Sequence, residues 1–172
     1  NPEEGGGCLY DYASHVINLI QEILGKPVRA EGTKLKQFYS KDVEDSVYSI
    51  LTLEDGLTGV LSVNWSDETY RKMSTSLVVL GKKGKIICDA TELKIYLKED
   101  NHAEKLGKGW TIRYITDYAI PVSFYLRGEE YSAQIDNFIK CVLSRKQTDV
   151  NTFRQGLYTD KVIELIIADS KK

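Results

Sequence analysis

The sequence predicts an α+β domain, in which an antiparallel-rich open sheet carries helices on one face. A helical pattern opens the chain, a long middle region has the pattern of strands joined by tight turns, and two helical patterns close it. That order is typical of α+β folds, in which hairpins build the sheet and helices cover one side of it. We expect residues 1–172 to form a single domain, because this length is enough to bury a substantial core.

The first helix is expected from about Cys8 to Leu24. Apolar residues recur there at the three- and four-residue spacing of one helix face, namely at Leu9, Val16, Ile17, Ile20, Ile23 and Leu24. Gly25 supplies a C-terminal stop, and Pro27 follows two residues later. The helix should therefore end at Leu24.

The middle of the chain is expected to form six or seven strands, at residues 28–39, 46–53, 57–65, 74–80, 85–88, 93–97 and 110–118. Two of the connections are hairpin signals. Asp55-Gly56 separates one pair of β-rich runs, and the glycines of Gly81-Lys82-Lys83-Gly84 separate another. Residues 98–108 are polar and are expected to form a surface loop.

Two amphipathic helices are expected at the end of the chain. The first has an apolar stripe from Tyr131 to Leu143, and the second has one from Phe153 to Ile166. Asp149 or Asn151 is the expected N-cap of the second helix.

Composition excludes several classes of function. The formal net charge is −2 with no basic patch, which gives no support for nucleic-acid binding. No apolar run approaches the roughly 20 residues that cross a bilayer, and no signal peptide is evident. Cys8, Cys88 and Cys141 lie far apart, which argues against a disulfide framework or a metal site and suits a cytoplasmic protein. The chain begins with Asn-Pro rather than Met, so we expect it to be part of a longer protein.

The run from Gly5 to His15 is the most informative part of the sequence. It places three glycines before the first helix, followed by an acid and a histidine four residues apart, Asp11 and His15. On an α-helix such positions share a face, with Cβ atoms about 5–6 Å apart. A carboxylate there orients the imidazole and favours its protonated form, which suits a proton-transfer group. The same spacing occurs in surface ion pairs and among helix-capping acids, so spacing alone leaves both interpretations open.

Taken together, residues 5–18 read Gly-Gly-Gly-x-Leu-x-Asp-x-Ala-Ser-His-x-x-Asn. This string resembles the opening of the second domain in the glucose–fructose oxidoreductase and inositol dehydrogenase (Gfo/Idh/MocA) family, whose usual pattern is Gly-Gly-Gly-x-Leu-x-Asp-x-Gly-x-His-x-x-Asp. Ala13 and Asn18 depart from that pattern, whereas Asp11 and His15 match it. The hairpins at 47–65 and 77–86 and the closing helices resemble the family's later segments in the same order.

The resemblance implies a two-domain NAD(P)-dependent oxidoreductase, of which this chain is the C-terminal domain. The family's N-terminal Rossmann domain binds NAD or NADP. No Gly-x-Gly-x-x-Gly motif follows a strand in this chain, and the family's Glu-Lys-Pro motif is also absent. We therefore expect no cofactor-binding residue and no metal ligand in this chain, and we do not interpret Gly5-Gly6-Gly7 as a phosphate loop.

By the same resemblance, His15 is the catalytic acid/base or its close relay, and Asp11 orients it and contacts the substrate. Asn18, Asn64, Tyr70 and Arg71 are candidate substrate-binding residues, although an asparagine such as Asn18 on a helix surface is more often merely solvated. His102 stands alone in a loop and has no expected catalytic role.

The function that follows is that of a substrate-binding and oligomerisation domain. The complete enzyme would act on the secondary hydroxyl of a sugar, cyclitol or sugar nucleotide, and it would form a homodimer or tetramer through the open face of the sheet. The isolated chain should be inactive. The alternative is a stand-alone, non-catalytic binding or dimerisation module of the same fold.

Overall fold

The computed structural model describes residues 6–69, 73–118, 124, 129–147 and 150–172. The chain divides into two compact units. Unit 1 comprises Asn1–Arg71 and Thr148–Lys172, and unit 2 comprises Lys72–Gln147. Each unit is described by itself below, and the expectation of a single domain stays a prediction.

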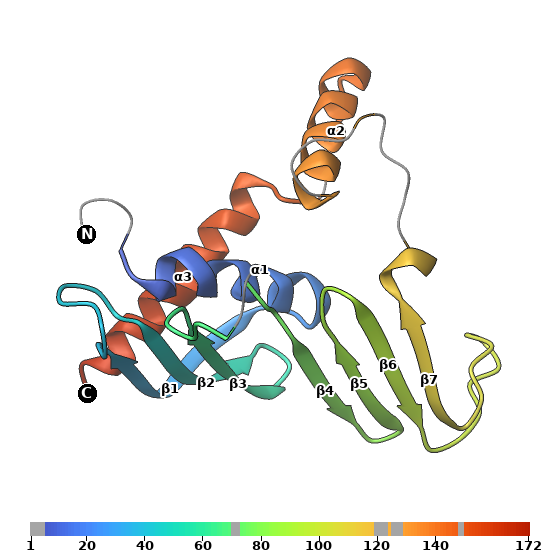
Figure 1. Cartoon of the computed structure of the whole chain (residues 1–172), viewed down its shortest axis with the longest axis horizontal. Coiled ribbons are helices and arrows are strands. Elements are labelled where there is room, and N and C mark those ends of the chain that lie inside the picture. Colours follow the sequence, from blue (N-terminus) through green and yellow to red (C-terminus); the bar gives the residue numbers. More distant parts are fainter. Residues whose placement is uncertain (1–5, 70–72, 119–123, 125–128, 148–149) are drawn as a thin grey trace. The chain divides into compact units, whose positions relative to one another are not determined.

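Unit 1 is a three-stranded antiparallel sheet with helices on one face (Figure 1). The strands lie in the order β1-β2-β3, and the turn at Asp55-Gly56 joins the last two as predicted. Gly56 has a φ of +86°, a conformation that favours glycine. The elements of this unit are η2 (Leu9–Ala13), α1 (Ser14–Ile23), β1 (Pro27–Lys36), β2 (Ser46–Leu53), β3 (Thr58–Asn64) and α3 (Phe153–Ser170).

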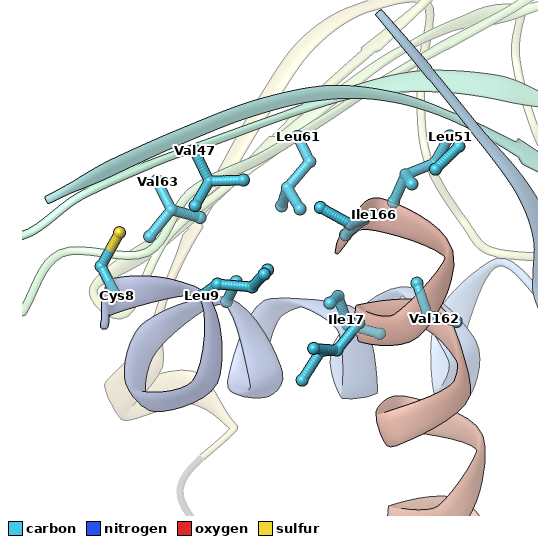
Figure 2. Packing of buried hydrophobic residues seen from close by; sticks show 12 residues of the cluster. Cys8, Leu9, Ile17, Val47, Leu51, Leu61, Val63, Val162 and Ile166 are labelled. Atoms are coloured by element: carbon cyan, nitrogen blue, oxygen red, sulfur yellow. The ribbon is translucent and has the colours of Figure 1, made fainter. Parts of the chain in front are cut away.

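The core of unit 1 lies between the sheet and these helices. Figure 2 shows side chains from the two layers pointing toward one another, with Leu9 and Ile17 on the first helix, Val47 on β2 and Ile166 on α3. All four are at most 1% exposed. Because burial of a large aliphatic side chain contributes about 1.5–3 kcal/mol, this apolar layer stabilises the position of the first helix against the sheet.

The opposite face of this sheet is open. Alternation along β2 and β3 places Tyr48, Ile50 and Val60 on that face, and the register pairs Ile50 with Val60. Val60 is 77% exposed. The described residues of unit 1 thus confirm a sheet covered by helices on one side.

Unit 2 contains a four-stranded antiparallel sheet in the order β4-β5-β6-β7. The predicted Gly81–Gly84 hairpin joins its first two strands. A 16-residue helix, α2, follows later in the chain. The elements of unit 2 are β4 (Leu77–Gly81), β5 (Gly84–Cys88), β6 (Glu92–Leu97), β7 (Gly109–Tyr114), η3 (Ile115–Asp117) and α2 (Glu129–Ser144).

Several details differ from the sequence prediction. The predicted strand at 110–118 ends at Tyr114, and Ile115–Asp117 form the 3-10 helix η3. The strands form two sheets rather than one continuous sheet. The first helix begins with a π-helical turn, η2, before it becomes α-helical at Ser14. The predicted N-cap of α3 at Asp149 or Asn151 is wrong, because Thr152 caps the helix in a capping box with Gln155. Asn151 has a φ of +56°, whereas an N-cap residue requires the extended backbone that Thr152 adopts.

No helix within the described residues is long and apolar enough to cross a membrane. The three cysteines are free thiols.

Candidate functional site

The first helix carries both predicted catalytic residues on its solvent side. Asp11 lies in the π-helical turn and His15 is the second residue of α1. Both side chains are exposed, and no ion pair or hydrogen bond among those of the described residues joins them. Single π-helical turns occur frequently at functional sites. The carboxylate and the imidazole are therefore accessible to a ligand.

The start of this helix is held by a residue from a distant part of the chain. Cys8 at the N-cap position makes no side-chain capping bond. Instead, its backbone N–H donates to the carbonyl oxygen of Glu44 at 3.0 Å, and the N–H of Leu9 donates to the Glu44 carboxylate at 2.9 Å. The N–H groups of Tyr10 and Asp11 donate to the carbonyl oxygen of Gly7, each at 3.1 Å. Glu44 thus supplies acceptors that the first helical turn lacks.

The glycine string has a steric role at this point. A Cβ on Gly7 would collide with the carboxylate of Glu44, and Gly6 has a φ of +80°. A carboxylate therefore already occupies the anion-binding end of this helix. The glycine string does not fit a nucleotide pyrophosphate, because the phosphates would meet the negative charge of Glu44 at the same N–H groups.

Asp45, the next residue, is a buried carboxylate that accepts several hydrogen bonds. Its donors are the N–H groups of Phe38, Tyr39 and Ser40, the hydroxyl of Ser40 and the indole N–H of Trp65, at 2.5–3.3 Å. These bonds, led by the Ser40 hydroxyl and the Tyr39 N–H, hold the pKa of Asp45 well below its usual range. The Asp45 side chain is therefore a fixed structural anion.

Trp65 links this carboxylate to the first helix. Its ring meets the ring of Tyr12 edge-on, with centroids 6.1 Å apart and an interplanar angle of 89°. Such edge-to-face pairs add about 0.5–1.5 kcal/mol beyond area burial. Tyr12 follows Asp11 directly, so this contact fixes the backbone next to the candidate catalytic acid.

Cys8 directly precedes the π-helical turn, and its side chain is fully buried. Burial, together with the negative charges of Glu44 and Asp45, raises the pKa of the Cys8 thiol to about 12. The thiolate is therefore negligible at neutral pH, which makes Cys8 a core residue rather than a nucleophile. No cluster of three or more His, Cys, Asp or Glu side chains suited to a metal ion occurs among the described residues.

Among the described residues, the structure does not bring the candidate substrate-binding residues together on one face. Asn18 is half-buried on α1, one turn beyond His15. Asn64 ends β3 and lies on the open face of the sheet, whereas the preceding residue, Val63, lies on the covered face. The amide oxygen of Asn64 accepts from the N–H of Ser66 at 2.6 Å. Alternation therefore separates Asn64 from the helix that carries Asp11. Tyr70 and Arg71 lie outside the described residues.

Sequence reasoning did not find Glu44 and Asp45. They lie before β2 in an ordinary polar stretch, and their partners are up to 36 residues away. The only local trace of their role is the third glycine of the string, Gly7, whose missing side chain leaves room for Glu44. The partly buried Trp65 packs against the core of unit 1.

The chain has the same fold as several solved dehydrogenases. A levoglucosan dehydrogenase in complex with NADH and levoglucosan matches with a TM-score of 0.78 and 18% identity, over 97% of this chain and 49% of that one. An NAD-binding oxidoreductase from Klebsiella pneumoniae matches with a TM-score of 0.75 and 19% identity, over 98% of this chain and 49% of that one.

A third similar structure is the WlbA dehydrogenase from Bordetella pertussis in complex with NADH and UDP-GlcNAcA. Its TM-score is 0.65 and its identity 18%, over 96% of this chain and 43% of that one. The chain thus spans about half the length of these proteins. A comparison with curated protein sequences gave no match.

A family assignment comes from the sequence itself. Residues 1–87, just over half of the 172, match the GFO/IDH/MocA C-terminal domain. The matched part contains the glycine string, Asp11 and His15, and the whole β1–β2–β3 sheet. The family that the sequence resembled is confirmed by this match, and the antiparallel α+β fold agrees with it. The chain belongs to the GFO/IDH/MocA C-terminal domain family.

Proposed function

We propose that this chain is the substrate-binding and oligomerisation domain of an NAD(P)-dependent oxidoreductase that acts on the secondary hydroxyl of a sugar, cyclitol or sugar nucleotide. The observation that carries the proposal is the solvent-exposed pair Asp11 and His15 on the first helix of a chain of this family. The solved relatives bound to levoglucosan or to UDP-GlcNAcA support the substrate class.

In this proposal His15 exchanges a proton with the hydroxyl oxygen of the substrate, or relays it to the group that does. Imidazole suits this task near neutral pH. Asp11, four residues earlier, orients the ring and contacts the substrate. Asn18 extends the same side of the helix by one turn. Asn64, Tyr70 and Arg71 stay proposed substrate contacts of lower priority.

The cofactor, NAD or NADP, is assigned mainly to a second domain that this chain does not contain. The glycine string gives a structural reason, because Glu44 occupies the helix end where a phosphate would sit. The complete enzyme supplies the redox chemistry, whereas this chain binds and orients the sugar-like substrate. The isolated chain should accordingly show no dehydrogenase turnover.

Oligomerisation is proposed through the open face of the β1–β2–β3 sheet. The centre of this face carries three exposed, largely apolar side chains, those of Tyr48, Ile50 and Val60. Apolar patches of this kind mark interaction sites more often than ordinary surface. A homodimer or tetramer would cover them.

The experiment that tests the proposed function starts from the protein as its source organism makes it. Its intact mass and N-terminal sequence are determined, and reduction of NAD and NADP is followed with a panel of sugars, cyclitols and sugar nucleotides. We expect a polypeptide about twice as long that oxidises at least one of them. A native chain that starts near Asn1 and shows no turnover would instead support the stand-alone binding module.

A further inference from the structure

We propose that Glu44 and Asp45 act as positioning residues for the candidate site, because together they fix the start of the helix that carries Asp11. Neither residue contacts a reacting group in this proposal. The effect on activity rests on the proposed function, whereas the effect on the helix start does not. Two consecutive acidic residues thus hold one helical turn from two sides.

Glu44 holds the main chain before Asp11. Its carbonyl oxygen accepts from the N–H of Cys8 at 3.0 Å, and its carboxylate accepts from the N–H of Leu9 at 2.9 Å. The carboxylate occupies the space that a side chain at Gly7 would fill. A charged acceptor at a helix N-terminus is among the stronger hydrogen bonds in proteins, and the positive end of the helix dipole favours it.

Asp45 fixes the side chain of Tyr12, the residue after Asp11, through Trp65. The carboxylate fixes the indole of Trp65 through a 3.0 Å hydrogen bond, and that indole packs edge-on against Tyr12. The backbone of the two residues is also joined, since the N–H of Trp65 donates to the carbonyl oxygen of Asp45 at 3.1 Å. The position of Tyr12 therefore depends on the loop that folds around Asp45.

Asp11 lies between these two fixed points. On one side, the N–H groups of Cys8 and Leu9 donate hydrogen bonds to Glu44. On the other side, the ring of Tyr12 packs against Trp65, which is hydrogen-bonded to Asp45. Local hydrogen bonds from the N–H groups of Tyr10 and Asp11 to Gly7 shape this turn, and the contacts with Glu44 and Trp65 fix where the turn lies. Small displacements of such groups are costly in catalysis, by about a hundredfold for an error of 1 Å.

A contribution to general stability is the alternative, and the chain offers a matched control for it. Asp169 on α3 also accepts a hydrogen bond from a distant backbone N–H, that of Thr33, at 2.8 Å. Thr33 lies on β1, at an irregularity in the strand pairing rather than at the first helix. Asp169→Ala therefore removes a comparable long-range bond without touching the helix start.

The first measurement is amide hydrogen exchange by NMR on the 172-residue chain, together with the imidazole resonances of His15. In Glu44→Ala we expect the amides of residues 9–11 to exchange about tenfold faster than in the wild type, with a shift of the His15 resonances. Glu44→Gln keeps an acceptor oxygen and should restore most of the protection. Asp169→Ala should leave these amides and resonances unchanged at equal global stability.

The proposal is overturned if Glu44→Ala leaves the amides of residues 9–11 unchanged, or if Asp169→Ala affects them equally. Should Glu44→Ala fail to fold, Asp45→Asn decides, since it must alter this helix start more than Asp169→Ala does. In the complete enzyme, Glu44→Ala should lower kcat by about tenfold to a hundredfold with a smaller change in KM. If the wild-type enzyme shows no turnover, the proposed function fails. The hydrogen-exchange pattern then decides by itself whether Glu44 and Asp45 fix the start of the helix.

Discussion

The indole N–H of Trp65 donates a 3.0 Å hydrogen bond to the carboxylate of Asp45, which is only 1% exposed. Further donors come from the loop before β2, among them the Ser40 hydroxyl at 2.5 Å. Hydrogen bonds donated to a carboxylate favour its ionised form. The Asp45 carboxylate therefore joins three segments: the loop before β2, the start of β2 and the end of β3.

The first prediction concerns pH. Because these hydrogen bonds hold the pKa of Asp45 below its usual range, the unfolded chain binds more protons than the folded chain over the interval between the two values. The stability that Asp45 contributes is thus fully present above the ordinary aspartate pKa of about 3.9 and is lost as the pH falls below it. In urea denaturation, Asp45→Asn should be less stable than the wild type at pH 7, and the difference should shrink toward pH 3.

Asp55→Asn is the control for this series. Asp55 lies in the exposed β2–β3 turn and accepts a single backbone bond, from the N–H of Leu57 at 3.0 Å. Its substitution should change the denaturation midpoint at pH 7 much less than Asp45→Asn does. A difference between wild type and Asp45→Asn that stays constant from pH 7 to pH 3 would contradict the assignment.

The second prediction concerns the third glycine. Gly7→Ala should lower the free energy of unfolding by about 1.5–3 kcal/mol, the usual worth of a hydrogen bond to a charged group, because the new methyl group displaces the Glu44 carboxylate from the N–H of Leu9. In a Glu44→Ala background the same substitution should cost much less. A double-mutant cycle from thermal unfolding measures this coupling. Equal costs in the two backgrounds would show that Gly7 is required for another reason.

Much of the fold follows from patterns that are local in the sequence. The Asp55-Gly56 and Gly81–Gly84 turns, and the seven strands around them, were predictable because turn chemistry and period-2 alternation act within a few residues. The predicted strand at 46–53 matches β2 at both ends. The division into two sheets was not predictable in this way, since it depends on which strand edges pair after the chain has folded.

The candidate site likewise combines features that local sequence patterns predict with features that depend on long-range contacts. The Asp11–His15 spacing is local, and the sequence alone indicated one helix carrying both. The contact of Glu44 with the start of that helix joins residues 35 positions apart, so no local pattern reports it. The apolar spacing does not distinguish a π-helical turn from an α-helical one, so an ordinary α-helix was expected at Leu9–Ala13.

The third prediction concerns the open sheet face. Ile50→Lys or Val60→Lys places a charge at the centre of the proposed interface, and burial of an unpaired charge is strongly unfavourable. Either substitution should convert an oligomer to a monomer, as measured by light scattering after size-exclusion chromatography. Ile23→Lys is the matched control, because Ile23 is an exposed apolar residue on α1 rather than on the sheet. An unchanged mass in both sheet variants would exclude this face as the interface.

The most direct test of the central claim compares the two histidines of the chain in the complete enzyme. His15 lies on the first helix and His102 in the loop between β6 and β7, and both are exposed. Substitution of either should therefore change the free energy of unfolding by no more than about 0.5 kcal/mol. We expect His15→Ala to lower kcat by about 10²–10⁴-fold, the usual contribution of general acid–base catalysis, and His102→Ala to leave it unchanged. Equal turnover in wild type and His15→Ala would contradict the account.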